Sequence, residues 1–175
     1  MADKTEKTAG QLLREKLCLT DKNIYDSFTD SDIAAMREYC DGYMRFLDAA
    51  KTEREAVKYG IEMAEAEGYS EFRFGDKLNV GGKYYYNNRG KALYIFTVGS
   101  RPLTDGIHIA AAHIDSPRLD LKQKPLYENN GIAYLKTHYY GGIKKYQWTT
   151  IPLALHGSVS KADGSVVDVR IGEDE

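Results

Sequence analysis

The residues of this sequence whose types and spacing best suit chemistry are His113 and Asp115, in the stretch AAAHIDSPRL at residues 110–119. Side chains two positions apart on an extended chain point to the same side, with their Cα atoms about 7 Å apart. Because Pro117 keeps Ser116 extended and ends strand pairing, a turn there would let the aspartate reach one ring nitrogen of the histidine. A histidine held by a carboxylate presents its other nitrogen to a metal. The pair therefore predicts a metal ligand, His113, and a carboxylate that orients it, Asp115.

The spacing alone leaves a second interpretation open, in which both residues are polar side chains at the end of a strand. A catalytic zinc takes at least three protein ligands, and no further histidine or carboxylate cluster in the sequence has a diagnostic spacing. His108 is predicted to be a packed histidine on the opposite face of the same strand, and His138 and His156 are predicted to be structural. The sequence indicates no Ser/His/Asp set, no phosphate-binding glycine loop and no cysteine nucleophile.

Two helices are predicted upstream of this pair, after a polar lead-in. The first spans residues 29–51 and opens with a Thr29–Asp32 capping box. The second spans residues 52–68 and opens with a Thr52–Glu55 capping box. Apolar residues recur every three or four positions in both segments, which predicts one packing face on each helix.

Strands are predicted after the second helix, where apolar runs are bounded by turn residues. A short buried strand at residues 107–112 leads directly to His113. The pair would then lie at the carboxyl end of a strand, where sites gather in open α/β sheets. Hairpins are predicted at residues 83–99, 118–142 and 153–172, with turns at Asn87–Gly90, Glu128–Gly131 and Asp163-Gly164.

The order of these elements predicts an α/β fold that is incomplete. The strand pattern runs into the acidic cluster IGEDE at residues 171–175, and no helix follows to cover the second face of the sheet. We therefore expect the chain to be the front part of a longer protein.

Composition excludes several classes of function. The 175 residues are 42% hydrophobic and 29% charged, as in soluble globular proteins. The net charge of −2 predicts no surface for nucleic acid, and no apolar segment has the length of a membrane span. Cys18 and Cys40 occur without a secretory signal, so we expect reduced thiols and a cytoplasmic protein.

Two motifs resemble those of a known family. AAHIDSP resembles the HTDSP signature of the M18 metallo-aminopeptidases, the family of aspartyl aminopeptidase and vacuolar aminopeptidase I. HYYGGIKKYQW resembles the TYGGG motif of that family and its following tryptophan, here Tyr140, Gly141, Gly142 and Trp148. The two motifs have the family's order and separation, and the resemblance runs from about Asn23 to the end of the chain.

The resemblance implies a site and a domain organisation. In that family the histidine of the first motif binds one of two active-site metals, and the aspartate orients that ligand; these roles fall on His113 and Asp115. The remaining ligands and the glutamate general base would come from beyond residue 175. The implied fold is an α/β/α zinc-peptidase domain, begun here by residues 1–147. Residues 148–175 would be the first strands of an inserted β-rich dimerisation domain, through which the homo-oligomer would assemble.

The function implied by the resemblance is a metal-dependent aminopeptidase. It would release single N-terminal residues from peptides with a metal-activated water, using two zinc ions or another divalent metal. This chain alone is expected to be inactive, because it supplies only one ligand. After Trp148 the chain reads TTIPL where many members have FDRDL, which favours a broad or neutral N-terminal preference over an acidic one. Two alternatives remain, another metallohydrolase on a similar sheet and a non-catalytic assembly module whose tyrosine-rich strands form an interface.

Overall fold

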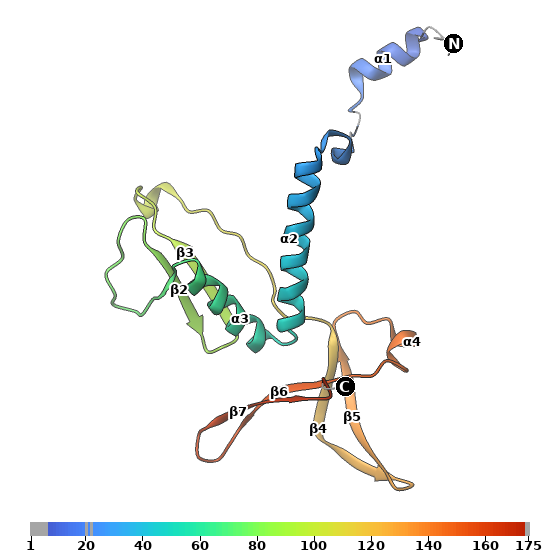
Figure 1. Ribbon diagram of the computed structural model, residues 1–175, viewed down its shortest axis with the longest axis vertical. Coiled ribbons are helices and arrows are strands. Elements are labelled where there is room, and N and C mark those ends of the chain that lie inside the picture. The colour runs from blue at the N-terminus through green and yellow to red at the C-terminus, as the bar shows by residue number, and fades with distance from the viewer. Residues whose placement is uncertain (1–6, 20, 22, 174–175) are drawn as a thin grey trace. The chain divides into compact units, whose positions relative to one another are not determined.

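The computed structural model describes residues 7–19, 21 and 23–173, which fall into two units, one ending at Tyr43 and the other beginning at Met44 (Figure 1). The first unit contains helix α1 (Ala9–Leu17) and the 3-10 turn Ile24–Ser27. The sequence predicted only a polar lead-in here, and α1 corrects that prediction. The local signal was present, because Thr8 and Gln11 form a reciprocal capping box at the start of the helix.

Helix α2 (Asp30–Ala49) spans the boundary between the units and begins where the sequence predicted. The backbone N–H of Thr29 donates to Asp32 Oδ2 at 2.8 Å, and the Asp32 N–H donates to Thr29 Oγ1 at 3.3 Å. This is the predicted capping box. The predicted packing face is not formed, because none of the residues of α2, all of which are described, is buried.

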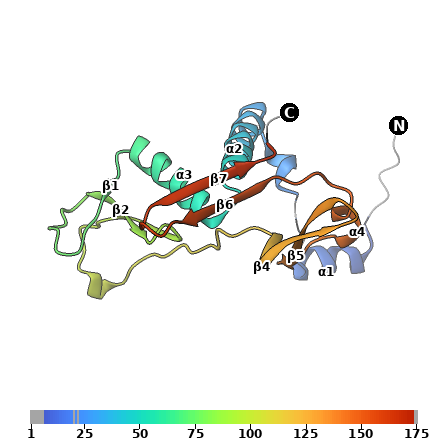
Figure 2. The same ribbon diagram turned by 90° about the horizontal axis from the view of Figure 1, so that it is seen from below.

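The core of the second unit is formed where helix α3 (Glu53–Ala66) packs on strands β2 (Lys83–Asn88) and β3 (Ala92–Thr97), as Figure 1 shows for all three and Figure 2 for α3 and β2 from below. The Thr52–Glu55 capping box is confirmed. Strand β2 pairs in parallel with the short β1 (Ser70–Glu71) and antiparallel with β3, so the predicted hairpin is also confirmed. Among the described residues, the buried apolar side chains are Ala50, Ala56, Val57, Ala64 and Tyr85.

Two further hairpins follow in the second unit, both as predicted. Strand β4 (Arg118–Asn129) pairs with β5 (Ile132–Tyr140), and its register shifts between Leu121 and Leu126. Pro125 explains the shift, because it has no backbone N–H for the ladder. After the short helix α4 (Lys145–Trp148), strand β6 (Leu155–Ser160) pairs with β7 (Val166–Ile171).

The buried strand predicted at residues 107–112 is wrong. After the 3-10 turn Leu103–Asp105, residues 107–117 run without strand pairing. Ile107 and Ile109 are 63% and 76% exposed. A buried strand requires hydrogen-bonded neighbours, and within the described residues the three sheets offer none to this segment.

The fold class is confirmed as mixed α/β, with three helices and three separate small sheets supplying most of the regular structure of the described residues. No helix in the described part of the chain has the length and apolar content needed to cross a bilayer.

Candidate functional site

His113 and Asp115 lie in the extended segment that immediately precedes β4. Strand β4 begins at Arg118, directly after Pro117. The sequence predicted the pair at the end of a strand, whereas the structure places it just before the start of one. The predicted effect of Pro117 is therefore reversed, because pairing begins at Arg118, directly after the proline, and residues 107–117 have no strand pairing for it to end.

The structure brings the two predicted site residues together. His113 Nδ1 lies 3.3 Å from Asp115 Oδ1 and 2.9 Å from the backbone oxygen of Asp115. Both of these contacts use Nδ1, which therefore carries the ring proton in the neutral histidine. Nε2 is then the atom with a lone pair for a metal. The His113 side chain is 83% exposed and that of Asp115 is 33% exposed, so the histidine is much more open to solvent than the carboxylate beside it.

A tyrosine from the second motif completes this group. The hydroxyl of Tyr140, the last residue of β5, donates a hydrogen bond to Asp115 Oδ2. This hydrogen bond holds the pKa of Asp115 below its ordinary value, and the charges of His113 and Arg118 act in the same direction. The same hydrogen bond raises the pKa of Tyr140, because ionisation would place a second negative charge beside the carboxylate.

Arg118 holds the tyrosine ring from the neighbouring strand. Its guanidinium carbon lies 4.3 Å from the ring centroid of Tyr140, a cation–π contact. Arg118 Nε also donates to Asp120 Oδ1 at 2.7 Å, and another guanidinium nitrogen donates to the backbone oxygen of Ser116 at 3.2 Å. The group therefore has one histidine, one carboxylate and one phenol, held by an arginine.

The other predicted features near this group give a mixed result. His108 is exposed, so its prediction as a packed histidine is wrong. His138 lies exposed in β5, opposite Asp120 in the register. Within the described residues, no group of three or more His, Cys, Asp and Glu side chains is placed to hold a metal. His113 and Asp115 therefore fit one ligand position with its supporting carboxylate, and this part of the chain does not form a whole zinc site.

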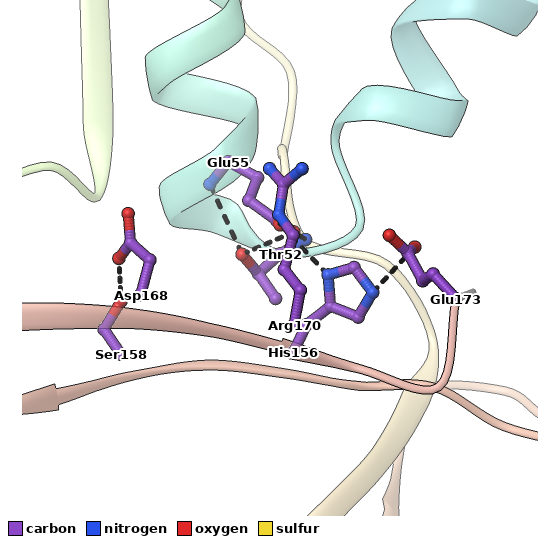
Figure 3. Close-up of polar contacts among 7 residues, drawn as sticks. All are labelled: Thr52, Glu55, His156, Ser158, Asp168, Arg170 and Glu173. Carbon is purple, nitrogen blue, oxygen red and sulfur yellow. Dashed lines mark hydrogen bonds and ion pairs between the residues drawn. The ribbon is translucent and has the colours of Figure 1, made fainter.

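A second polar cluster was not predicted from the sequence. His156 of β6 lies between two carboxylates, with Nδ1 3.0 Å from Glu55 Oε1 and Nε2 2.9 Å from Glu173 Oε1 (Figure 3). Arg170 Nε of β7 lies 2.9 Å from the same Glu55 oxygen. The His156 side chain is only 9% exposed. The prediction of a structural role for His156 agrees with this position, where it joins the β6–β7 hairpin to α3.

This cluster has the chemistry of an ion-pair network and not of a metal site. The guanidinium of Arg170 contacts the same Glu55 oxygen as His156, so a cation already occupies that position. Burial raises the pKa of Glu55, but the hydrogen bond and charge of His156, the hydrogen bond from Thr52 and the charge of Arg170 outweigh it. The pKa of Glu55 therefore lies below its ordinary value.

Glu55→Gln should loosen this attachment of the hairpin to α3. Both carboxylate oxygens are used, since Oε2 accepts from Thr52 while Oε1 faces His156 and Arg170, and an amide offers only one acceptor oxygen. We expect a loss of about 1–3 kcal/mol in the free energy of unfolding at pH 7, as for hydrogen bonds to charged groups. Urea unfolding followed by circular dichroism measures it.

The pH dependence of this difference has a defined sign. Because the folded pKa of Glu55 is lowered, its stabilisation is present above the ordinary glutamate value of 4.5 and is lost as the pH falls through the folded pKa. The gap between wild type and Glu55→Gln should therefore shrink in acid. Glu62→Gln, an exposed change on the same helix, is the matched control. Its free energy of unfolding should equal that of wild type both at pH 7 and in acid. A gap that widened in acid would contradict the assignment.

Comparison with known proteins gives the context of both motifs. A family model described as “Aminopeptidase I zinc metalloprotease (M18)” matches residues 46–173. The curated protein “Probable M18 family aminopeptidase 1” of Clostridium acetobutylicum is 49% identical over 158 residues, which cover 88% of this chain and 34% of that protein. The chain spans about a third of the length of the curated relatives it matches first. The family model begins at residue 46, but the match to the Clostridium acetobutylicum protein covers 88% of this chain, which agrees with a resemblance that runs from about Asn23 to the end.

Solved structures agree with the sequence matches. Aminopeptidase I from Borrelia burgdorferi B31 superimposes with a TM-score of 0.81 at 34% identity, covering 88% of this chain and 39% of that one. Aminopeptidase I from Clostridium acetobutylicum gives a TM-score of 0.73 at 48% identity, covering 90% of this chain and 36% of that one. Residues 110–119 and Tyr140 lie inside the range that the family model matches.

Proposed function

Because the chain belongs to the M18 family of aminopeptidases, we propose that it is part of a zinc-dependent enzyme that releases single residues from the N-termini of peptides. The observation that carries this proposal is the contact between His113 and Asp115 within a motif of the family. An orienting carboxylate on Nδ1 is the usual partner of a histidine that binds zinc through Nε2. The alternative of a non-catalytic assembly module gives no reason for this contact.

The residues of this chain support one ligand position. We propose that His113 binds zinc through Nε2 and that Asp115 keeps the proton on Nδ1 and fixes the plane of the ring. A bound zinc ion polarises a carbonyl and lowers the pKa of water, which is the chemistry that peptide hydrolysis requires. Asp115 thus acts on the reaction through His113, by holding the ligand in one tautomer and one orientation.

The remainder of a two-metal site would come from residues outside this chain. In support, the described residues contain no group of three candidate ligands, and the relatives are about three times as long as the matched region. We propose that the general base and the other ligands belong to that additional length. We call a protein of the relatives' length that carries this chain the full-length protein.

The proposal also includes a domain organisation and a cellular location. Residues 1–147 would belong to the catalytic domain, and residues 148–175 would begin an inserted β domain used for homo-oligomer assembly. The β6–β7 hairpin supports a need for a partner, because Val159, Val166 and Ile171 are 53%, 59% and 60% exposed and an isolated two-stranded hairpin is marginal in water. Peptides in the cytoplasm would be the substrates.

The experiment that tests the function is an assay of the full-length protein on short peptides. We expect free amino acids to appear one at a time from the N-terminus, and no release from the same peptides when the N-terminus is acetylated. Peptides that begin with leucine and with aspartate compare neutral with acidic preference. Cleavage at internal bonds, or hydrolysis of acetylated and free peptides alike, would contradict an aminopeptidase.

A further inference from the structure

We propose that Tyr140 is a positioning residue of the zinc site: its hydroxyl fixes the carboxylate of Asp115, which in turn fixes the metal-binding histidine. This inference rests on the proposed function and adds a residue to it. It starts from one observation, the hydrogen bond from the Tyr140 hydroxyl to Asp115 Oδ2. Asp115 Oδ1, the other oxygen, faces His113 Nδ1 at 3.3 Å. The two oxygens of one carboxylate therefore have different partners.

Two different partners limit the orientation of the Asp115 carboxylate. A carboxylate held through one oxygen can rotate about its Cβ–Cγ bond, because that terminal torsion is broad. The tyrosine supplies a second point of attachment on the opposite oxygen, which limits the rotation. The plane of Asp115 is then set by β5, an element outside the segment that contains the histidine. A metal ligand with a fixed carboxylate has a fixed tautomer and ring orientation.

The backbone places the tyrosine for this contact. Tyr140 pairs with Arg118 in the β4–β5 register, so the two side chains share one face of the hairpin. Arg118 follows Asp115 by three residues. Its pairing with Tyr140 therefore brings the end of β5 beside residues 113–117, called the site segment here. The arginine also contacts the tyrosine ring, with its guanidinium carbon 4.3 Å from the centroid.

The glycine after the tyrosine permits this close approach. Gly141 has φ +71°, and a Cβ on it would lie 3.3 Å from Pro117 Cα, a backbone atom of the site segment. A side chain at this position would be strained and would press the end of β5 away from Pro117. A Cβ on Gly142 would meet no atom of the described residues within 4 Å. The tyrosine and the first glycine of this motif therefore act together, one by its hydroxyl and one by its lack of a side chain.

Tyr140→Phe in the full-length protein is the direct test, because it removes one hydroxyl and keeps the ring under Arg118. Loss of an orienting partner of a metal ligand typically weakens metal binding or activity about 10–100-fold. Tyr140 acts one step further away, so we expect zinc affinity to fall about three- to tenfold, measured by competition with a chelator. We expect kcat to fall with little change in KM, and the unfolding midpoint of the zinc-free protein to stay unchanged.

Tyr139→Phe is the matched control. Tyr139 precedes Tyr140 in β5 and pairs with Leu119, so it lies on the opposite face of the hairpin. Its ring also makes a cation–π contact, with Lys145 Nζ 4.0 Å from the ring centroid, so the two tyrosines have similar surroundings. Loss of its hydroxyl should leave zinc affinity unchanged. Equal losses in Tyr139→Phe and Tyr140→Phe would indicate a general effect of the hairpin and overturn the proposal.

A double-mutant cycle with Asp115→Asn decides whether the tyrosine acts through the aspartate. We expect Tyr140→Phe to cause no further loss of zinc affinity once Asp115 is changed, because the oriented carboxylate is already gone. A full additional loss in that background, or no loss in the wild-type background, overturns the proposal, even where the variant also lowers stability. If Asp115→Asn and His113→Ala also leave zinc binding unchanged, the zinc site itself is wrong. If those two variants weaken zinc binding and Tyr140→Phe does not, the role of the tyrosine alone is wrong.

Discussion

His113→Ala in the full-length protein should remove one zinc ion per subunit and nearly all peptidase activity. The expected loss is large because the variant deletes a ligand, and the three or more ligands of a hydrolytic zinc site act as a unit. The fold should survive, since the His113 side chain is 83% exposed and contributes little to packing. Elemental analysis and release of free amino acids measure the two effects, and thermal unfolding of the zinc-free protein measures the third.

Asp115→Asn tests the carboxylate beside the same histidine. The variant keeps the size of the side chain and removes the charge that faces His113 Nδ1, so zinc should bind about 10–100-fold more weakly with a similar loss of activity. His108→Ala is the control, because His108 is an exposed histidine of the same extended segment without a proposed role. Unchanged turnover in both site variants, or an equal loss in the control, would reject the assignment of the pair.

The parts of the fold that could be predicted from the sequence are those set by local signals. Helices α2 and α3 begin at capping boxes that a four-residue pattern reveals. The three hairpins depend on turn residues, and Asn130 and Gly131 at one of them adopt the positive φ angles that such turns require. Each signal lies within a few residues of the structure it produces.

The parts that could not be predicted depend on partners distant in the sequence. The apolar run at residues 107–112 has the composition of a buried strand, but strand formation requires hydrogen-bonded neighbours that composition does not supply. The cluster around His156 could not be predicted for the same reason, because its partner Glu55 lies 101 residues earlier in the sequence. The alternation of β6 and β7 places His156 opposite Arg170, yet nothing local indicates which helix they contact.

The candidate site also has one contact that local spacing predicts and one that depends on residues distant in the sequence. His113 and Asp115 are two residues apart, so spacing and a following proline were sufficient to predict their contact, which the structure forms. Tyr140 is 25 residues from Asp115, and its motif gave no reason to expect a hydrogen bond to the carboxylate. The hairpin register connects them, since it places the end of β5 beside the start of β4. The sequence predicted this hairpin and its turn but not its register, and the register is what places Tyr140 beside the site.

Residues 1–175 made alone should not cleave peptides. This chain has one proposed ligand, His113, and one proposed orienting carboxylate, Asp115, whereas a hydrolytic zinc site needs three or more ligands. We expect no stoichiometric zinc and self-association, because apolar side chains such as Ile107 and Ile109 are largely exposed and the β6–β7 hairpin has unpaired strand edges. Mass in solution, elemental analysis and an assay for free amino acids measure the three outcomes, with the full-length protein as the positive control.

Either of two separate causes would make this chain inactive, a missing ligand set or a failure to fold. Far-UV circular dichroism and the Glu55→Gln comparison distinguish them, because the attachment of the β6–β7 hairpin to α3 through His156 and Glu55 requires only residues of this chain. If the chain is folded by that criterion, the lack of zinc is explained by its ligands alone, and His113→Ala should change nothing further in it. A monodisperse monomer that holds two zinc ions and cleaves peptides would contradict the prediction, since ligands for both ions would then have to lie within these 175 residues.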